Sequence, residues 1–471
     1  MELADVLSGD SGLAGVRWLL LSQTRRRLLR GELTRMLADP NLLGPCYLRR
    51  AKFKPGRKLT ASYDVRLRDS RGRLRDRRPI TVTWTAQGNG LAPMSLTGGT
   101  VLESEALSRG LATPFQTLEA GTPGRSMQIV VSPLDARFPQ LVRFSDPGFL
   151  SGLVGGTNCR VTPIRYRPGQ RHVLRYDFEG SNGSLETVFA KLYRDDRGER
   201  TFEVARRVGD WLTGNDTSTA AVAALAYLPD SRVLLYPALS GAPLSRYLAR
   251  SGDGERHLRQ AGALLRALHR APLALADRPD QYELADEIRA VARASQHIQV
   301  LQPRSESRIT AILDRARELY DRLPQDRPTV THGDYKLDHL WLARGRLTLI
   351  DFDRSCIADP ALDIGKFLAD LHWWHLMADR AGLREAQRAF LGGYAAVPSY
   401  SLIRRARVYE AILLVKIAAR RVPLFDRGWH PLTEALIARG ETTLAALERE
   451  CRARQPSRSR RQLGATAAIT T

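Results

Sequence analysis

Residues 331–363 constrain this chain more than any other stretch. Two short polar motifs, His-Gly-Asp at 332–334 and Ile-Asp-Phe-Asp at 350–353, lie next to apolar, β-prone runs. The runs at 340–342 and 347–350 flank a short glycine turn, a pattern typical of a β-hairpin. Because antiparallel strands return the chain to its starting point, such a hairpin brings both motifs to the same end of the fold.

The side chains of this stretch suit phosphoryl transfer. That reaction needs a group to receive the proton of the attacking hydroxyl, metal ligands beside the triphosphate, and positive charge on the phosphates. Asp334 can orient or deprotonate a hydroxyl, and Lys336 can reach toward the γ-phosphate. His339 and Asp351 can supply metal ligands from the two ends of the hairpin. The sequence therefore predicts a phosphoryl-transfer site at this end of the hairpin.

The same stretch resembles the catalytic centre of the aminoglycoside phosphotransferase and choline kinase-like superfamily, relatives of protein kinases. The family pattern is His-Gly-Asp, four residues and Asn, then Ile-Asp, then Asp-Pro-x-x-Asp. The matching residues are His332, Gly333, Asp334, Ile350, Asp351, Asp359, Pro360 and Asp363. The resemblance implies that Asp334 is the catalytic base, that Asp351 is the principal metal ligand, and that Asp363 braces the loop. It also implies ATP and Mg²⁺ as cofactors.

One position departs from the family pattern, because the metal-binding Asn falls on His339. Mg²⁺ prefers oxygen ligands in a tight octahedron, and an imidazole nitrogen is a poorer partner. Asp338 has the right chemistry if the loop is one residue shorter than usual, so Asp351 is expected to act with either His339 or Asp338. The alternative interpretation is a catalytically impaired nucleotide-binding or scaffold protein that lost turnover through His339.

A second pattern is an internal repeat. Aligned without gaps at an offset of 113, Cys46, Pro55, Gly56, Tyr63 and Asp64 fall on identical residues in the segment that begins at Cys159. We infer that residues 46–140 are a degenerate copy of the small β-rich lobe at 156–240.

The second copy carries the expected nucleotide-binding residues. Lys191, in the apolar run 187–193, resembles the family lysine that neutralises the α- and β-phosphates. Glu203, or its competitor Glu199, is expected to pair with Lys191. The run at 234–241, with Pro237 and Leu239, matches the hinge whose backbone binds adenine in the family.

The first copy lacks this lysine. Trp84 or Thr85 stands where it would fall, so we expect a cap or a dimerisation element there, with a homodimer through this lobe as one outcome.

Composition narrows the class of protein. The chain has 471 residues, 43% hydrophobic and 26% charged, as in soluble globular proteins, and no apolar run long enough to cross a membrane. The start of the chain does not resemble a secretory signal, and Cys46, Cys159, Cys356 and Cys451 are scattered, which favours a reducing cytoplasm. The net charge of +22 is spread over all segments, so we interpret it as a basic surface that suits a nucleotide rather than a nucleic-acid site.

These observations predict an α+β, two-lobed kinase-like fold with an extra N-terminal lobe. The expected parts are a helical segment at 1–45, a cap at 46–150, a nucleotide-binding lobe at 151–240, a helical lobe at 241–451 and a disordered basic tail at 452–471. Residues 14–38 are predicted to form one amphipathic helix, and Trp373 and Trp374 to line the acceptor site. The expected reaction is transfer of the γ-phosphoryl group of ATP to a hydroxyl of a small molecule such as a sugar, an amino alcohol or an antibiotic-like compound.

Overall fold

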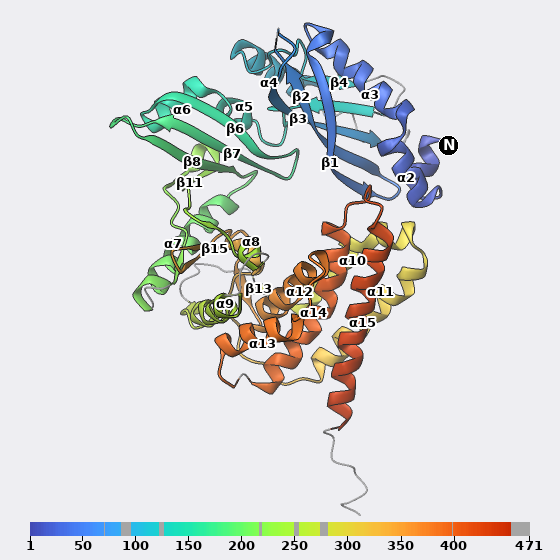
Figure 1. Ribbon diagram of the computed structural model, residues 1–471, viewed down its shortest axis with the longest axis vertical. Helices are drawn as coiled ribbons and strands as arrows, with labels where there is room; N and C mark the ends of the chain where they lie inside the picture. The colour runs from blue at the N-terminus through green and yellow to red at the C-terminus, as the bar shows by residue number, and fades with distance from the viewer. Residues whose placement is uncertain are drawn as a thin grey trace, which may run out of the picture.

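The computed structural model describes residues 1–69, 71–85, 96–121, 127–215, 219–248, 254–273, 281–397 and 399–453. It has three parts: an N-terminal lobe, a second β-rich lobe beside it, and a helical lobe below both (Figure 1). The predicted α+β class is confirmed. Most of the predicted tail, from residue 454 onward, lies outside the described residues, and the last helix reaches Ala453.

The N-terminal lobe is a five-stranded sheet with helices against it. Its strands, in the order β1-β2-β3-β5-β4, are β1 (Leu43–Lys54), β2 (Lys58–Arg68), β3 (Leu74–Thr85), β5 (Met127–Val131) and β4 (Glu119–Gly121). The helical elements are α1 (Leu3–Ser8), α2 (Gly12–Leu21), α3 (Gln23–Met36), a short 3₁₀ turn (Pro40–Leu42) and α4 (Leu96–Ser108). Two helices replace the single one predicted for 14–38, because Ser22 is extended and its side chain caps α3 by accepting the Arg25 N–H at 3.4 Å.

The second lobe has a sheet of the same strand order. It runs β6 (Thr157–Arg167), β7 (Arg171–Glu179), β8 (Leu185–Leu192), β11 (Val233–Pro237) and β10 (Ala226–Leu228). Short helices α5 (Gln140–Phe144) and α6 (Pro147–Val154) precede it, and α7 (Arg197–Asn215) lies between its third and fourth strands in sequence. This lobe has an apolar core of its own, built from the sheet and α5–α6.

The two sheets correspond in register as well as in order. The first hairpin closes at Lys54↔Lys58 and the second at Arg167↔Arg171, an offset of 113 in both strands. Lys191 pairs with Val173, and the equivalent pair in the first sheet is Thr60↔Thr83. Thr83 therefore occupies the lysine position, and the prediction of Trp84 or Thr85 was wrong by one or two residues. Common origin of the two lobes stays a prediction that this correspondence supports.

The N-terminal lobe packs on the rest of its own chain. Its buried apolar side chains belong to the same core as those of the helical lobe, and β1 and α2 contact α10 (Leu284–Leu301). At the other side, the buried Asp135 accepts the Gly169 N–H at 2.6 Å and lies 2.7 Å from His172 Nε2. The lobe thus supports the β6–β7 turn that faces the predicted phosphate site.

The helical lobe surrounds two small sheets. Residues 238–241 lead from β11 into β12 (Ala242–Pro243), which pairs with β15 (Leu340–Ala343), so the predicted hinge does join the lobes. The sheets also contain β9 (Thr219–Ala221), β16 (Arg346–Leu349), β13 (Gln281–Tyr282), β14 (Thr329–Thr331) and β17 (Cys356–Ala358). The remaining helices are α8 (Leu244–Leu248), α9 (Gly254–His269), α11 (Arg304–Asp321), α12 (Ala361–Met377), α13 (Leu383–Tyr394), α14 (Tyr400–Arg421) and α15 (Trp429–Ala453).

Within the described ranges, none of the helices has the length and apolar character needed to cross a membrane.

Candidate active site

The predicted hairpin forms and brings the two motifs together. Strands β15 and β16 pair antiparallel and are joined by Arg344 and Gly345, both at positive φ, as in the tight turns that favour hairpins. The His-Gly-Asp motif follows β14, and Asp351 follows β16. Gly333 has φ +71°, and a Cβ there would lie 2.1 Å from the carbonyl oxygen of Arg354, so only glycine fits this close approach.

Helix α12 holds this loop in place through two buried carboxylates. Asp363 accepts the backbone N–H of His332 at 2.6 Å and of Gly333 at 2.8 Å. Asp370 accepts the N–H of Leu337 at 2.9 Å. Both carboxylates are fully buried, so they satisfy loop donors that water cannot reach. The geometry agrees with the bracing role that the resemblance implied for Asp363.

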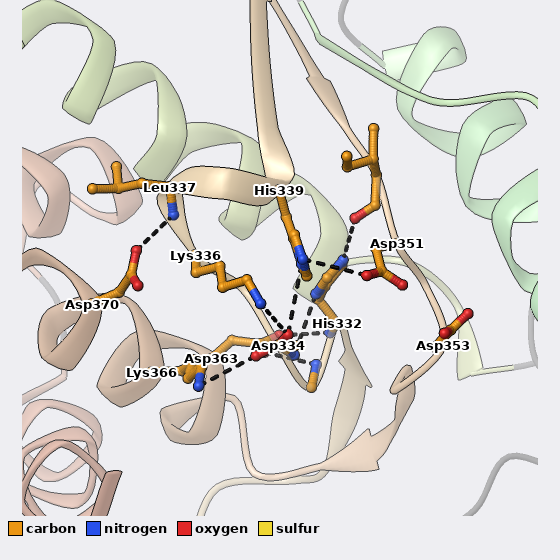
Figure 2. A network of polar contacts seen from close by, with 12 residues as sticks. His332, Asp334, Lys336, Leu337, His339, Asp351, Asp353, Asp363, Lys366 and Asp370 are labelled. Atoms are coloured by element: carbon orange, nitrogen blue, oxygen red, sulfur yellow. Dashed lines mark hydrogen bonds and ion pairs between the residues drawn. The ribbon is translucent and has the colours of Figure 1, made fainter. Parts of the chain in front are cut away.

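Asp334 lies at the centre of the loop network (Figure 2). Lys336 Nζ donates to its Oδ2 at 2.6 Å, and Lys366 Nζ of α12 lies 3.3 Å from Oδ1. Burial by itself would raise the pKa of Asp334, but the ammonium groups of Lys366 and Lys336 outweigh it and hold the pKa well below its usual range. Asp334 is therefore an ionised carboxylate at neutral pH, able to accept a hydrogen bond from a hydroxyl.

The second β-rich lobe reaches this loop through two cations. Lys191 Nζ lies 2.7 Å from Asp351 Oδ1 and 2.6 Å from Asp353 Oδ1. Arg171 Nη2 lies 2.5 Å from Asp353 Oδ2, and its Nη1 lies 3.5 Å from Asp351 Oδ2. Tyr193 donates its hydroxyl to Asp353 at 2.7 Å. The two lobes thus meet at a pair of carboxylates shared by two cations.

These contacts set the charge state of Asp351. Burial would raise its pKa, but the cations Lys191 and Arg171 bring the pKa well below its usual range. Asp351 also has φ +68°, a conformation that costs a non-glycine residue roughly 1–3 kcal/mol and is common at functional sites.

His339 lies between the two motifs. Its Nε2 is 3.4 Å from Asp351 Oδ2, and its Nδ1 is 3.9 Å from Asp334 Oδ2 (Figure 2). Burial, reinforced by the nearby Lys336, lowers the pKa of His339 to about 3, so the imidazole is neutral at physiological pH. The alternative ligand, Asp338, instead accepts a hydrogen bond from Ser245 of α8 at 2.7 Å.

The donor set fits a magnesium ion through carboxylates rather than through the imidazole. In the described part of the chain, no three His, Cys, Asp or Glu side chains converge as a metal cluster. Asp351 and Asp353, however, already share one cation, the ammonium of Lys191. Mg²⁺ in phosphoryl-transfer sites usually takes one or two carboxylates and completes its shell with water and phosphate oxygens. Asp351 and Asp353 would therefore hold the ion. The sequence predicted Asp351 and His339 as ligands, and His339 lies 3.4 Å from Asp351.

One predicted contact is not formed. Glu203 of α7 makes ion pairs with Arg206 at 3.1 Å and Arg207 at 3.6 Å, and Lys191 is held by Asp351 and Asp353. The expected Lys191–Glu203 pair was therefore wrong for this structure, because two aspartates in the facing loop lie within reach of the ammonium. Pro237 and Leu239 lie at the junction of the lobes, and their adenine-binding role stays a prediction.

Three residues of this site were missed by sequence reasoning. Asp353 stands two residues after Asp351, and that spacing alone could have indicated a second carboxylate. Arg171 lies at the end of the β6–β7 turn. Only the tertiary fold brings this turn to the loop that carries Asp353, so no pattern in the sequence indicated the contact. Lys366 had a clearer signal, since Asp363, Lys366 and Asp370 form a polar stripe at helical spacing in the otherwise apolar start of α12.

A pocket adjoins Asp334 and is lined by Lys366 of α12 as well. Its charged lining residues are Glu287, Asp334, Arg354, Lys366, Lys416 and Arg420. Trp373 and Trp374, which the sequence suggested for the acceptor site, are not part of this lining. Trp373 is buried, with the guanidinium of Arg421 5.9 Å from its ring centre.

One family model matches the chain. The model of the phosphotransferase enzyme family matches residues 164–401, half of the chain, and no curated protein matches the sequence.

Several solved structures resemble the fold. A choline/ethanolamine kinase family protein from Mesorhizobium loti is 17% identical, with 63% of this chain and 94% of that chain covered and a TM-score of 0.43. An aminoglycoside phosphotransferase from Streptomyces rimosus is 20% identical, with 57% and 96% covered and a TM-score of 0.39. An amicoumacin kinase, solved with AMP-PNP and Ca²⁺, is 12% identical, with 64% and 94% covered and a TM-score of 0.47.

Proposed function

The chain belongs to the phosphotransferase enzyme family, and we propose that it transfers the γ-phosphoryl group of ATP to a hydroxyl group of a small molecule. One observation carries the proposal. Lys191 and Arg171 of one lobe converge with Asp351 and Asp353 of the other, and His339 lies between Asp351 and the ionised Asp334. Cations, metal-ligating carboxylates and a proton acceptor are the parts that phosphoryl transfer requires.

In the proposed reaction, the acceptor hydroxyl donates a hydrogen bond to Asp334, and its oxygen attacks the γ-phosphorus in line with the leaving group. The bond between the γ-phosphorus and the β–γ bridging oxygen breaks, and ADP leaves with that electron pair. Because the pKa of Asp334 lies well below its usual range, this carboxylate is a weak base that orients the hydroxyl and receives its proton late.

The cations around the loop have separate tasks. Lys191 and Arg171 would exchange their contacts with Asp351 and Asp353 for contacts with phosphate oxygens. Lys336 lies beside Asp334, where it would neutralise charge on the transferred phosphoryl group. Asp351 and Asp353 would hold a magnesium ion, whose charge would offset that of the phosphates.

Calorimetric titration of ATP, with and without Mg²⁺, tests the binding half of this proposal. Asp351→Asn should abolish the effect of Mg²⁺, whereas Asp338→Asn, in the same loop but bonded to Ser245, should not. Asp334→Asn should keep Mg²⁺-dependent ATP binding and lower the turnover of ATP by about 10²–10⁴-fold. ATP binding that depends on neither Mg²⁺ nor Asp351 would contradict the proposal and would favour a nucleotide-binding protein without catalysis.

Turnover of the His339→Asn variant distinguishes a working phosphotransferase from a catalytically impaired nucleotide-binding or scaffold protein. Since Asp351 and Asp353 supply the carboxylates, turnover of the native protein should not depend on restoring the family asparagine. Turnover that appears only in His339→Asn would mean that the native chain is not a phosphotransferase.

A further inference from the structure

The pocket beside Asp334 holds more positive than negative charge. Four cations, Arg354, Lys366, Lys416 and Arg420, line it together with two carboxylates, Glu287 and Asp334. The pocket opens next to the carboxylate that would orient the acceptor hydroxyl, so a molecule bound in it would present its hydroxyl to Asp334. Its charge therefore bears on which acceptor the protein takes.

Neither carboxylate of the pocket is available to a cationic ligand. Glu287 is buried, accepts the Tyr282 hydroxyl at 2.7 Å and forms an ion pair with Lys416. Asp334 is held by two lysines, as described above. A positively charged acceptor would have to displace one of these ammonium groups and would leave it buried without a partner, which is costly.

The two arginines, by contrast, have unused donors. Arg354 and Arg420 are exposed at the pocket mouth, and no carboxylate of the described residues lies within ion-pair distance of either guanidinium. The excess positive charge also lowers the pKa of the buried Lys416. Burial lowers its pKa to about 7 even though Glu287 opposes the shift, and Arg354 and Lys366 contribute in the same direction as burial.

The N-terminal lobe extends the positive field over this mouth. Arg50 and Lys52 lie on β1, which contacts α10, the helix that carries Glu287 (Figure 1). Burial lowers the pKa of both groups, and neighbouring cations act in the same direction, Arg165 before Arg420 for Arg50, and Lys54 and Arg50 before Arg420 for Lys52, so both side chains lie within electrostatic reach of Arg420. Both Arg420 and β1 lie outside the residues that match the family model.

We propose that the acceptor is an anionic hydroxyl compound, a phosphorylated or carboxylated small molecule, whose negative group binds between Arg354 and Arg420 while its hydroxyl faces Asp334. This inference rests on the proposed function and names the substrate class of the same site. Planar guanidinium groups bind phosphate and carboxylate oxygens through paired hydrogen bonds, so two arginines that have no carboxylate partner in the described part of the chain are a suitable anchor. Arg50 and Lys52 of the N-terminal lobe then add positive charge near the bound anion.

Titration of inorganic pyrophosphate into the full-length protein tests the site directly. The nucleotide site is first saturated with AMP-PNP and Mg²⁺, so that added pyrophosphate reports on the remaining anion site. The wild-type protein should bind the probe, and Arg354→Gln combined with Arg420→Gln should weaken this binding about tenfold or more. Both arginines are exposed, and thermal unfolding checks that the double variant is folded.

The matched control is Arg384→Gln combined with Arg388→Gln on α13, which removes the same charge from an exposed face elsewhere. It should bind the probe like the wild type. Equal weakening in both double variants would show a non-specific effect of net charge and would overturn the inference. Absence of pyrophosphate binding to the nucleotide-loaded protein would overturn it as well.

Failure of the phosphotransferase proposal can be distinguished from failure of the anionic-acceptor inference. If Mg²⁺-dependent ATP binding fails, the phosphotransferase proposal fails before the acceptor is considered. If ATP binds as proposed but glucosamine binds the nucleotide-loaded protein more tightly than glucose 6-phosphate does, the phosphotransferase proposal stands and the anionic acceptor is refuted.

Discussion

Replacing Asp363 with Asn tests whether α12 holds the loop that carries His332, Gly333 and Asp334. The Asp363 carboxylate is fully buried and accepts two backbone N–H groups, from His332 and Gly333, with His269 Nε2 3.3 Å away. An asparagine of the same size offers one oxygen and one NH₂ group. The NH₂ group would meet a backbone donor, so at least one buried N–H would lose its acceptor.

The magnitude follows from these bonds. A buried donor left without a partner costs about 1–3 kcal/mol, and loss of the charge on the remaining bond costs about another 1–2 kcal/mol. We expect Asp363→Asn to lower the free energy of unfolding by about 2–5 kcal/mol. In a lobe of about 200 residues, this corresponds to a melting temperature lower by roughly 5–15 °C.

Thermal unfolding followed by calorimetry measures this change, with Asp338→Asn as the control. Asp338 is in the same loop but accepts a single hydrogen bond from Ser245, which asparagine can also accept. The control should therefore melt close to the wild type. A melting temperature of Asp363→Asn within about 2 °C of the control would refute the bracing role of α12.

Three further changes have defined outcomes. Lys191→Met removes the ammonium shared by two carboxylates and should lower kcat/KM by about 10²-fold or more in a steady-state assay of ATP turnover; an unchanged value would contradict its role. Gly333→Ala places a Cβ against the Arg354 carbonyl at positive φ and should cost at least about 2 kcal/mol in denaturant unfolding, whereas a smaller loss would mean that the loop relaxes freely. His339 has a pKa of about 3 in the folded protein. Since an unfolded histidine titrates near about 6.5, the unfolded state takes up this proton first, and stability should fall by about 2 kcal/mol between about pH 7.5 and about pH 5. His339→Asn should lack this part of the loss, and equal losses in both proteins would show that the imidazole is not buried neutral.

Local sequence patterns predicted the elements of this fold well. The hairpin at 340–349 needed only two β-prone runs and a glycine turn, and the helices of the C-terminal half follow their apolar spacing. The repeat at offset 113 also predicted two sheets that proved to share strand order. Patterns of this kind are local, so the sequence contains them directly.

The charge partners could not be predicted in the same way. Lys191 was recognised, but its expected partner Glu203 pairs within its own helix, and Lys191 pairs with Asp351 and Asp353 about 160 residues away. Which of several carboxylates lies within a few ångströms of an ammonium depends on how two lobes close on each other. Side-chain spacing along one segment carries no information about that closure.

The sequence by itself determined the elements, the catalytic motif and the family, because motif spacing and apolar periodicity are properties of short segments. Only the tertiary structure decided the electrostatics of the site. It joined Arg171 to the loop that carries Asp351 and Asp353, and among the described residues it left Arg354 and Arg420 without carboxylate partners at the pocket beside Asp334. The physical reason is that the energy of a charge depends on its distance to other charges and on its burial, and both are set by segments far apart in the chain.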